Sequence, residues 1–311
     1  MDMDTPLSCG KLPPEMLSDL LSEFVTDDDS FLVKPGIGED TAAVFTPPEG
    51  VLVLKSDPIT FATDRIGYYS VLINANDIAT SGAVPRWFLV TLLLPPGTKG
   101  REIREIMGDL SSLCRRMGII LCGGHTEVTD SVNRPVVSGT LIGAVDERNL
   151  VRKTDISEGD AIILTKGVSV EGTSILCREF GGRLSELGMS PETVGRGKEF
   201  LSRISILEEA RIAAESGAVT GMHDVTEGGL AGALSELSEA VGREFLIRME
   251  EIPVYEETAE ACSLLEIDPL GLIGSGSLII CCRRGTEGEL RARIEAAGID
   301  ARIIGEVGGR G

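Results

Sequence analysis

The chain has 311 residues, of which 42% are hydrophobic, 25% charged and only 4% aromatic, with 38 glycines. This length allows two domains with their own cores, and the hydrophobic fraction excludes a disordered chain. A formal net charge of -20 argues against binding to nucleic acid phosphates or anionic membranes. The few aromatic residues also argue against stacking platforms for single-stranded nucleic acid.

The sequence predicts neither a membrane anchor nor a secretion signal. No apolar run is long enough to span a bilayer, and no charged start is followed by an apolar core and a small-residue cleavage site. The seven cysteines are scattered without a Cys-x-x-Cys pair, so we expect buried thiols rather than disulfides or a zinc ribbon. We therefore expect a cytoplasmic protein.

The chain begins with a loose arm and one helix, which together occupy residues 1–35. Pro14 opens this helix, and its apolar face includes Leu20 and Phe24. The acidic run at residues 27–29 follows it and is typical of a solvated loop. No chemistry is assigned to this part.

Residues 36–148 are predicted to form a first domain with the order β-β-α-β-α-β-β. The segment at residues 87–94 is apolar on both faces, so we expect each face of that strand to be covered. The predicted strands are 41–45, 51–56, 86–94, 119–122 and 136–145, and the predicted helices are 65–80 and 100–117.

The helix at residues 65–80 is the element around which the first domain is organised. Its apolar residues recur at helical spacing, and Gly82 and Pro85 follow it as stop signals. Asp77 lies in its last turn, where a negative charge faces the negative end of the helix dipole at a cost of about 0.3 to 1 kcal/mol. Helix stability therefore does not explain Asp77, and its position favours a bound cation.

Three further acidic residues also lie at the ends of predicted elements. Glu39 and Asp40 follow a glycine loop, and Asp57 follows an apolar strand. Carboxylates about 4 Å apart repel by about 4 kcal/mol at an effective dielectric near 20, so convergence would require Mg²⁺, which commonly also holds nucleotide phosphates. The alternative is that these are unrelated surface acids among the 49 Asp and Glu residues of the chain.

A domain boundary is predicted within residues 146–159, and the second domain then covers residues 149–311. The stretch at residues 181–197 carries few aromatic residues and is predicted to be a mobile loop. The predicted strands are 161–164, 244–248, 277–282 and 302–307, and the predicted helices are 170–180, 206–216, 228–240 and 287–297.

The glycine-rich segment after Asp224 is a candidate phosphate-binding element. Gly228 and Gly229 open a predicted helix, where a phosphate can approach backbone N–H groups at the positive end of the dipole. The alternative is a structural helix start with Thr226 as the N-cap. A Walker sequence is absent from the chain.

Several other polar residues are candidates for the same site. His223 beside Asp224 is either a general base or part of a pair that orders the loop. Lys166 ends a predicted strand and ranks ahead of Lys55 and Arg152 for neutralising a triphosphate. The turn at residues 274–277, which precedes a predicted strand, is expected to line the cleft.

The order of these motifs resembles the aminoimidazole ribonucleotide (AIR) synthase-related ATP-binding superfamily. Its members include PurM, thiamine-monophosphate kinase, selenophosphate synthetase and HypE. The resemblance covers about residues 36–307. It rests on Gly-x-Gly-Glu-Asp-x-Ala-Ala at 36–43, Ser-Asp at 56–57, Asn-Asp-Ile-Ala-x-x-Gly-Ala-x-Pro at 76–85, Gly-Gly-His-Thr at 123–126 and Asp-x-Thr-x-Gly-Gly-Leu at 224–230.

This resemblance implies a two-domain PurM-like α/β (α+β) fold, ATP and Mg²⁺ as cofactors, and a homodimer formed through the sheet of the first domain. The implied metal ligands are Glu39, Asp40, Asp57 and Asp77. The implied nucleotide-binding residues are Gly38, Asn76, Thr126, Asp224, Thr226, Gly228 and Gly229. The implied catalytic residues are His125, His223 and Lys166.

The sequence departs from the family pattern at His125, where the resembling enzymes commonly carry Asp or Glu that holds metal or polarises substrate. Three roles stay open for this histidine: a metal ligand, a phosphate contact when protonated, or a hydrogen bond within a loop. Glu127 is a candidate replacement for the missing carboxylate. The metal count and the reaction are therefore left open by the sequence.

Among the members, the sequence is most similar to HypE, chiefly through residues 76–79 and 224–231. The resemblance implies ATP-dependent activation of an amide or carbamoyl-type oxygen by phosphoryl transfer, in hydrogenase maturation or a paralogous role, with a possible maturation partner protein. HypE carries its carbamoyl group on a C-terminal Cys, whereas this sequence ends in Gly308-Gly309-Arg310-Gly311. The sequence is thus either truncated or a paralogue with another substrate, and we favour the paralogue. The alternatives are a small-molecule kinase like thiamine-monophosphate kinase and a non-catalytic ATP-binding maturation partner.

Overall fold

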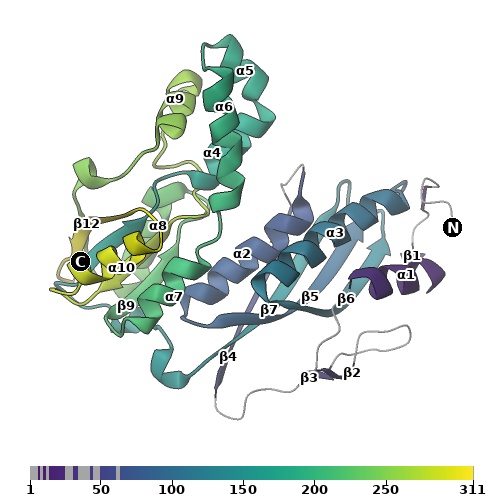
Figure 1. Ribbon diagram of the computed structural model, residues 1–311, viewed down its shortest axis with the longest axis horizontal. Helices are drawn as coiled ribbons and strands as arrows, with labels where there is room; N and C mark the ends of the chain where they lie inside the picture. Colours follow the sequence, from purple (N-terminus) through teal and green to yellow (C-terminus); the bar gives the residue numbers. More distant parts are fainter. Residues whose placement is uncertain are drawn as a thin grey trace. The chain divides into compact units, whose positions relative to one another are not determined.

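The computed structural model describes residues 6–7, 10–11, 14–24, 31–33, 43–44, 50–60 and 64–310. The chain divides into two compact units (Figure 1). Unit 1 consists of Met1–Ile78 and Ala83–Glu147, and unit 2 consists of Ala79–Gly82 and Arg148–Gly311. Helix α2 (Ile66–Thr80) therefore begins in unit 1, and its last two residues cluster with unit 2.

Unit 1 contains a five-stranded sheet with the strand order β1-β6-β5-β7-β4. Strands β5 and β6 are parallel, and the other neighbours are antiparallel. The strands are β1 (Gly10–Lys11), β4 (Val51–Ile59), β5 (Val84–Leu94), β6 (Ile120–Val128) and β7 (Val136–Val145), with β2 (Phe31–Val33) and β3 (Ala43–Val44) as a separate pair. The helices are α1 (Pro14–Phe24), α2 and α3 (Gly100–Met117).

Helix α2 packs closely on the sheet because two glycines of β7 leave room for it. A Cβ atom on Gly143 would lie 2.4 Å from Ile78, and one on Gly139 would lie 2.8 Å from the amide of Asn74. Asn74 is fully buried, and its amide donates to the carbonyl oxygens of Ser70 and Asp57. The predicted helix is confirmed, but it buries polar side chains as well as the expected apolar face.

The other face of the unit 1 sheet is more open. Strand β4 lies at one edge of the sheet, and its Leu52 and Leu54 are 41% and 67% exposed. On the adjacent strand β7, Ile142 and Ala144 lie opposite these two leucines and are half-buried. Unit 1 therefore presents apolar side chains on the sheet face and edge that its helices leave free.

Unit 2 contains a second five-stranded sheet with the order β10-β12-β8-β11-β9, and every neighbouring pair in it is antiparallel. The central strands β8 and β11 are buried along their whole length, which explains their unbroken apolar sequences. The strands are β8 (Ala161–Thr165), β9 (Val219–Asp224), β10 (Phe245–Ile247), β11 (Leu278–Cys282) and β12 (Ala301–Val307).

Helices cover both faces of the unit 2 sheet, so the fold is a mixed α/β architecture. One core joins the sheet to α7 (Leu207–Glu215) and α10 (Glu287–Ala296), through residues such as Ile163, Ala213 and Leu290. The opposite core joins it to α8 (Gly229–Val241) through Ile162 and Leu237. The two-domain PurM-like fold is confirmed.

The stretch predicted as a mobile loop is helical, so that prediction was wrong. It contains α5 (Gly181–Glu186) and α6 (Pro191–Lys198), which group with α4 (Val170–Glu179) and α9 (Glu256–Leu265) in Figure 1. Ser190 caps α6 by accepting from the Thr193 N–H at 3.0 Å, and Pro191 stands in its first turn. Buried Leu184, Met189 and Val194 then fix both helices in a small core.

Two other features bear on the class of protein. In the described part of the chain, no helix is both long and apolar enough to cross a membrane. The six cysteines in that part are buried and free, as predicted. Burial raises the pKa of the Cys114 thiol to about 12, so this thiol stays protonated at neutral pH.

Candidate functional site

In unit 1, two of the predicted metal ligands lie around one lysine. The ammonium of Lys55 on β4 lies 3.0 Å from Asp77 of α2 and 3.5 Å from Asp57 of β4. Lys55 and Asp57 point to the same face of the sheet because they are two residues apart on one strand. The structure thus brings Asp57 and Asp77 together, with one positive charge between them.

The contact with the two carboxylates keeps Lys55 protonated. Burial alone would lower the pKa of the Lys55 ammonium, but the hydrogen bond and charge of Asp77, followed by those of Asp57, raise it above the ordinary value. The Ser56 hydroxyl donates to the Gly139 carbonyl oxygen at 2.9 Å and fixes β4 against β7. The lysine is therefore charged at neutral pH, and the two carboxylates are partly neutralised.

Three other predicted site residues of unit 1 lie outside the described residues. These are the predicted metal ligands Glu39 and Asp40 and the predicted nucleotide-binding residue Gly38. Among the residues that the structure does describe, no group of three or more His, Cys, Asp or Glu side chains is arranged to hold a metal ion. The magnesium site stays a prediction, with Asp57 and Asp77 as its described part.

The Gly-Gly-His-Thr motif lies within β6 instead of following it, so the predicted end of that strand at residue 122 was wrong. Gly124 explains the difference, because a Cβ atom there would lie 1.8 Å from the Val90 carbonyl oxygen of β5. The glycine lets the two parallel strands stay paired through the motif.

His125 and Glu127 alternate with Thr126 along β6 and share one face of the strand. The His125 Nε2 atom lies 3.1 Å from the Glu127 carboxylate, and both side chains are exposed. The sequence did not predict this contact, and the proposal that Glu127 replaces the missing carboxylate stays a prediction. The roles of His125 and Thr126 in metal or nucleotide binding stay predictions.

In unit 2, three loops meet at one edge of the sheet. They follow β8 and β9 and precede β11, which runs antiparallel to both. The Val225 N–H donates to the Ser277 carbonyl oxygen at 3.0 Å, and the Gly274 N–H donates to that of Thr226 at 3.1 Å. The Ser277 hydroxyl donates to the Gly167 carbonyl oxygen at 2.5 Å. The loops predicted to carry Lys166, Asp224, Thr226 and the 274–277 turn thus form one connected cluster.

Gly228 and Gly229 both adopt left-handed backbone conformations, with φ of +79° and +62°. A Cβ atom on Gly229 would lie 2.3 Å from the Leu270 carbonyl oxygen, so only glycine fits. Gly228 is the N-cap of α8, so the alternative with Thr226 as N-cap is wrong. Two N–H groups near this end already donate within the chain, from Gly229 to Thr226 and from Ala231 to Leu270.

Lys166 is enclosed in the loop cluster. Its ammonium donates to the Ser205 and Gly276 carbonyl oxygens at 2.6 and 2.9 Å, and lies 2.6 Å from the Glu209 carboxylate, which is 1% exposed. Burial lowers the pKa of Lys166, and the charge of Glu209 opposes that shift. In this geometry Lys166 holds three segments together, and its predicted contact with phosphate would require it to exchange these bonds. Arg152, the other cation of unit 2 proposed from sequence, is exposed.

His223 does not pair with Asp224, because successive residues of β9 point to opposite faces. Its Nδ1 atom lies 3.1 Å from the Lys153 ammonium, and its Nε2 atom lies 3.4 Å from the Glu236 carboxylate. Burial and then the charge of Lys153 lower the pKa of the His223 imidazole, against the influence of Glu236. A neutral imidazole suits a general base, but the role stays a prediction.

Sequence reasoning missed one residue of the loop cluster, Glu171. It lies in the first turn of α4, is 6% exposed, and its backbone N–H donates to the Ser275 carbonyl oxygen at 3.1 Å. Its Oε2 atom is shielded from solvent and has no hydrogen-bond partner among the described residues. Burial raises the pKa of Glu171, against the hydrogen bond from Ser275. The sequence signal was an acid just inside the helix that follows an apolar strand.

The backbone around Glu171 is also unusual. Lys166 and Ser169 are non-glycine residues with positive φ of 56° and 57°. The Ser169 hydroxyl donates to the Pro269 carbonyl oxygen at 2.5 Å, which helps to hold this conformation. Such residues concentrate at functional sites, where the surrounding structure maintains the strain. The strained backbone therefore marks the loop cluster as a candidate functional site.

Comparison with known proteins supports the resemblance to the AIR synthase-related family. The model of the AIR synthase related protein N-terminal domain matches residues 38–145, and that of the C-terminal domain matches residues 157–311. A Methanocaldococcus jannaschii protein named for hydrogenase expression and formation is 28% identical over 283 residues, which are 88% of this chain and 81% of that protein. The carbamoyl dehydratase HypE of Cupriavidus necator is 28% identical over 281 residues, which are 87% of this chain and 77% of that protein.

The fold agrees with these matches. A solved structure of the hydrogenase maturation protein HypE in complex with ATP has a TM-score of 0.76 at 22% identity, covering 94% of this chain and 85% of that one. A chain of the HypE–HypF complex has a TM-score of 0.72 at 22% identity, covering 94% of this chain and 93% of that one. The two family models follow one another along nearly the whole sequence, and this chain therefore belongs to the AIR synthase-related family.

Proposed function

We propose that this protein is an ATP- and Mg²⁺-dependent enzyme that activates a carbamoyl-type or amide oxygen by phosphoryl transfer, in a role like that of HypE. The observation that carries the proposal is the pairing of Asp57 and Asp77 around the Lys55 ammonium. Family membership and the similarity to HypE, which has been solved with ATP, support the same reading.

The chemistry of Asp57 and Asp77 suits a magnesium ion, although two carboxylates alone do not complete its coordination. Asp57 and Asp77 offer carboxylate oxygens, which Mg²⁺ prefers, and a cationic group already lies within 3.5 Å of both. Glu39 and Asp40 are the further ligands that we propose from the sequence. When bound, Mg²⁺ would neutralise the charge on the ATP phosphates.

The loop cluster of unit 2 is proposed to serve the phosphates and the acceptor. Gly228, Gly229, Thr226 and Asp224 would bind phosphate at the start of α8. In the proposed reaction the acceptor oxygen attacks the γ-phosphorus and ADP leaves. Loss of phosphate, and of two protons from nitrogen over both steps, then converts the carbamoyl carbon to a nitrile. Glu171 is our candidate to accept one of these protons, because it is a buried carboxyl group with a raised pKa.

Two partners follow from the same proposal. The open apolar face of unit 1, with exposed Leu52 and Leu54, supports a homodimer formed through this sheet. The similarity to a chain of the HypE–HypF complex supports a maturation partner protein.

Phosphorus NMR, together with carbon NMR of a carbamoyl thioester labelled at its carbamoyl carbon, tests the reaction class in the presence of the purified protein, ATP and Mg²⁺. We expect ADP and inorganic phosphate to appear together, with the carbamoyl carbon becoming a nitrile. With thiamine monophosphate added as the acceptor, formation of its diphosphate and ADP without inorganic phosphate would instead identify a small-molecule kinase. Tight ATP binding with no turnover on any acceptor would identify a non-catalytic partner.

A further inference from the structure

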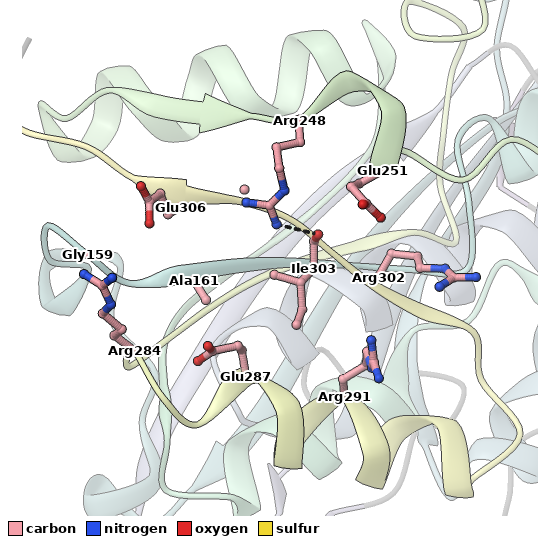
Figure 2. Close-up of a pocket in the computed structure, with 11 residues that line it drawn as sticks. Gly159, Ala161, Arg248, Glu251, Arg284, Glu287, Arg291, Arg302, Ile303 and Glu306 are labelled. Carbon is pink, nitrogen blue, oxygen red and sulfur yellow. Dashed lines mark hydrogen bonds between the residues drawn. The ribbon is translucent and has the colours of Figure 1, made fainter.

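A cavity in unit 2 is lined by four arginine side chains (Figure 2). It has a volume of about 430 Å³ and shares no residue with the loop cluster. The arginines are Arg248, Arg284, Arg291 and Arg302. This concentration is notable in a chain with 49 acidic and only 29 basic residues.

Each of the four arginines comes from a different segment of unit 2. Arg248 follows β10, Arg284 lies in the turn between β11 and α10, Arg291 is on α10, and Arg302 is on β12. Residues from four segments meet only through the tertiary fold, so helical or strand periodicity does not explain the cluster.

Strand β12 is irregular where it borders this cavity. The pairing of β12 with β8 shifts register between Ile303 and Gly305, which marks a bulge, and bulges commonly re-aim side chains next to sites. A Cβ atom on Gly305 would lie 2.2 Å from the Leu246 carbonyl oxygen, so β10 and β12 approach closely here. This approach lets the Arg248 guanidinium donate to the Ile303 carbonyl oxygen at 2.9 Å, which fixes it at the cavity wall.

Two guanidinium groups of the cavity lack acidic partners of the kind that Arg196 and Arg211 of unit 2 have. Arg196 lies 2.6 Å from Glu257, and Arg211 lies 2.7 Å from Glu215. Within the part of the chain that the structure describes, Arg284 and Arg302 make no side-chain hydrogen bond or ion pair. Their donor groups are therefore available to a ligand.

The acidic residues of the cavity do not neutralise these two arginines. Glu287 accepts a hydrogen bond from the Gly285 N–H at 2.6 Å, which caps the turn before α10. Glu251 and Glu306 also line the cavity, so its formal charge is only about +1 from four arginines and three glutamates. Recognition here must then come from directed guanidinium hydrogen bonds and not from a strong positive potential.

We propose that this cavity binds a small polyanion with at least two phosphate or carboxylate groups. Its volume is within the range of small-molecule sites, which is about 300 to 1,000 Å³. Arginine forks match the planar or trigonal oxygens of both kinds of group. The site is independent of the proposed function, because none of its residues belongs to the candidate site in either unit.

Calorimetric titration of the full chain with inorganic pyrophosphate and with citrate, in 0.15 M NaCl after divalent cations have been removed by dialysis, tests this site. We expect at least one of the two to bind, and Arg284→Gln and Arg302→Gln each to weaken binding at least tenfold. The control Arg211→Gln, which removes a paired arginine of unit 2, should leave binding unchanged. The preferred anion identifies phosphate or carboxylate as the recognised group.

Three results would overturn the proposal. These are no binding of either anion, equal binding in the wild type and both cavity variants, and an equal loss in the Arg211→Gln control. An Asp77→Asn variant separates this site from the proposed nucleotide site. Binding of the anion should survive that substitution even if binding of ATP does not.

Discussion

The Lys55 ammonium lies 3.0 Å from the carboxylate of Asp77, which joins the edge strand β4 to the last turn of α2. An acid in that turn is unfavourable for the helix, yet here it gains a cation from a neighbouring strand. The same ammonium reaches Asp57 at 3.5 Å. This arrangement keeps the two carboxylates beside one cation, and we propose that both would also lie beside a bound Mg²⁺.

Replacing Lys55 should expose the repulsion between these carboxylates. We expect Lys55→Met to lower the free energy of unfolding by about 1 kcal/mol without metal, because a partly exposed ion pair contributes on this scale. Mg²⁺ should then stabilise the variant more than the wild type. Thermal unfolding with and without Mg²⁺ measures both effects, and Lys99→Met is the matched control. Equal Mg²⁺ shifts in the three proteins would contradict this prediction.

Glu171 should make stability depend on pH. Its folded pKa is raised above the unfolded value, so its contribution is complete below about pH 4.3 and is lost as pH rises through the folded pKa. Glu171→Gln keeps the shape and removes this loss, so the variant should gain stability relative to the wild type as pH rises. Chemical denaturation from pH 4 to 9 provides the curves. Parallel curves for wild type and variant would show that Glu171 ionises freely.

As a control for that series, Glu199→Gln alters an exposed glutamate of unit 2. Its unfolding curve should follow the wild type at every pH. A matching gain in this control would mean that the overall charge of the protein, and not the burial of Glu171, causes the effect.

His223 should titrate below its ordinary range. Its folded pKa is lowered, so its contribution is present above about pH 6.5 and is lost as pH falls through the folded pKa. The chain has two histidines, so His125→Gln leaves a single ring to follow by NMR. Lys153→Met should raise the pKa of His223 toward its ordinary value. A His223 pKa at or above 6.5 in the otherwise unchanged protein would refute the lowered value.

Gly229 should tolerate no side chain. Gly229→Ala places a Cβ atom 2.3 Å from the Leu270 carbonyl oxygen. It also puts a residue with a side chain where the backbone has a left-handed φ of +62°. Gly217→Ala is a matched control, since its φ is +66° and nothing lies within 4 Å of the added atom. The control should lose about 1 to 2 kcal/mol of stability from backbone strain alone, and Gly229→Ala should lose clearly more. Equal losses of stability in the two variants would show that the loop around Leu270 moves to accommodate the added atom.

Local patterns were sufficient to predict most regular elements. The bounds of α3 and β7 agree with the prediction at both ends, because α3 has a clear helical period and β7 alternates strictly between buried and half-buried residues. The helices α5 and α6 were missed because their apolar residues are few, and only packing in a separate small core reveals them. Strand β6 was cut short because Gly123 and Gly124 suggest a turn, whereas close packing on β5 keeps the strand extended.

The candidate site was predictable only in part, for a similar reason. Motif order identified Asp57 and Asp77, but not that Lys55 would join them, because that contact links a strand to a helix end. The enclosure of Lys166 by Ser205, Glu209 and Gly276 likewise depends on contacts distant in sequence. Glu171 stands just inside the helix that follows an apolar strand, but this position does not by itself predict that its side chain is buried.

Calorimetric titration of ATP into the wild type and Asp77→Asn, with and without Mg²⁺, tests the central claim most directly. Asp130→Asn, an exposed acid of unit 1, serves as the control. We expect Mg²⁺-dependent ATP binding in the wild type and the control, and at least a tenfold loss in Asp77→Asn while the fold stays intact. Unchanged ATP affinity in Asp77→Asn, or no ATP binding by the wild type in Mg²⁺, would contradict the proposed site.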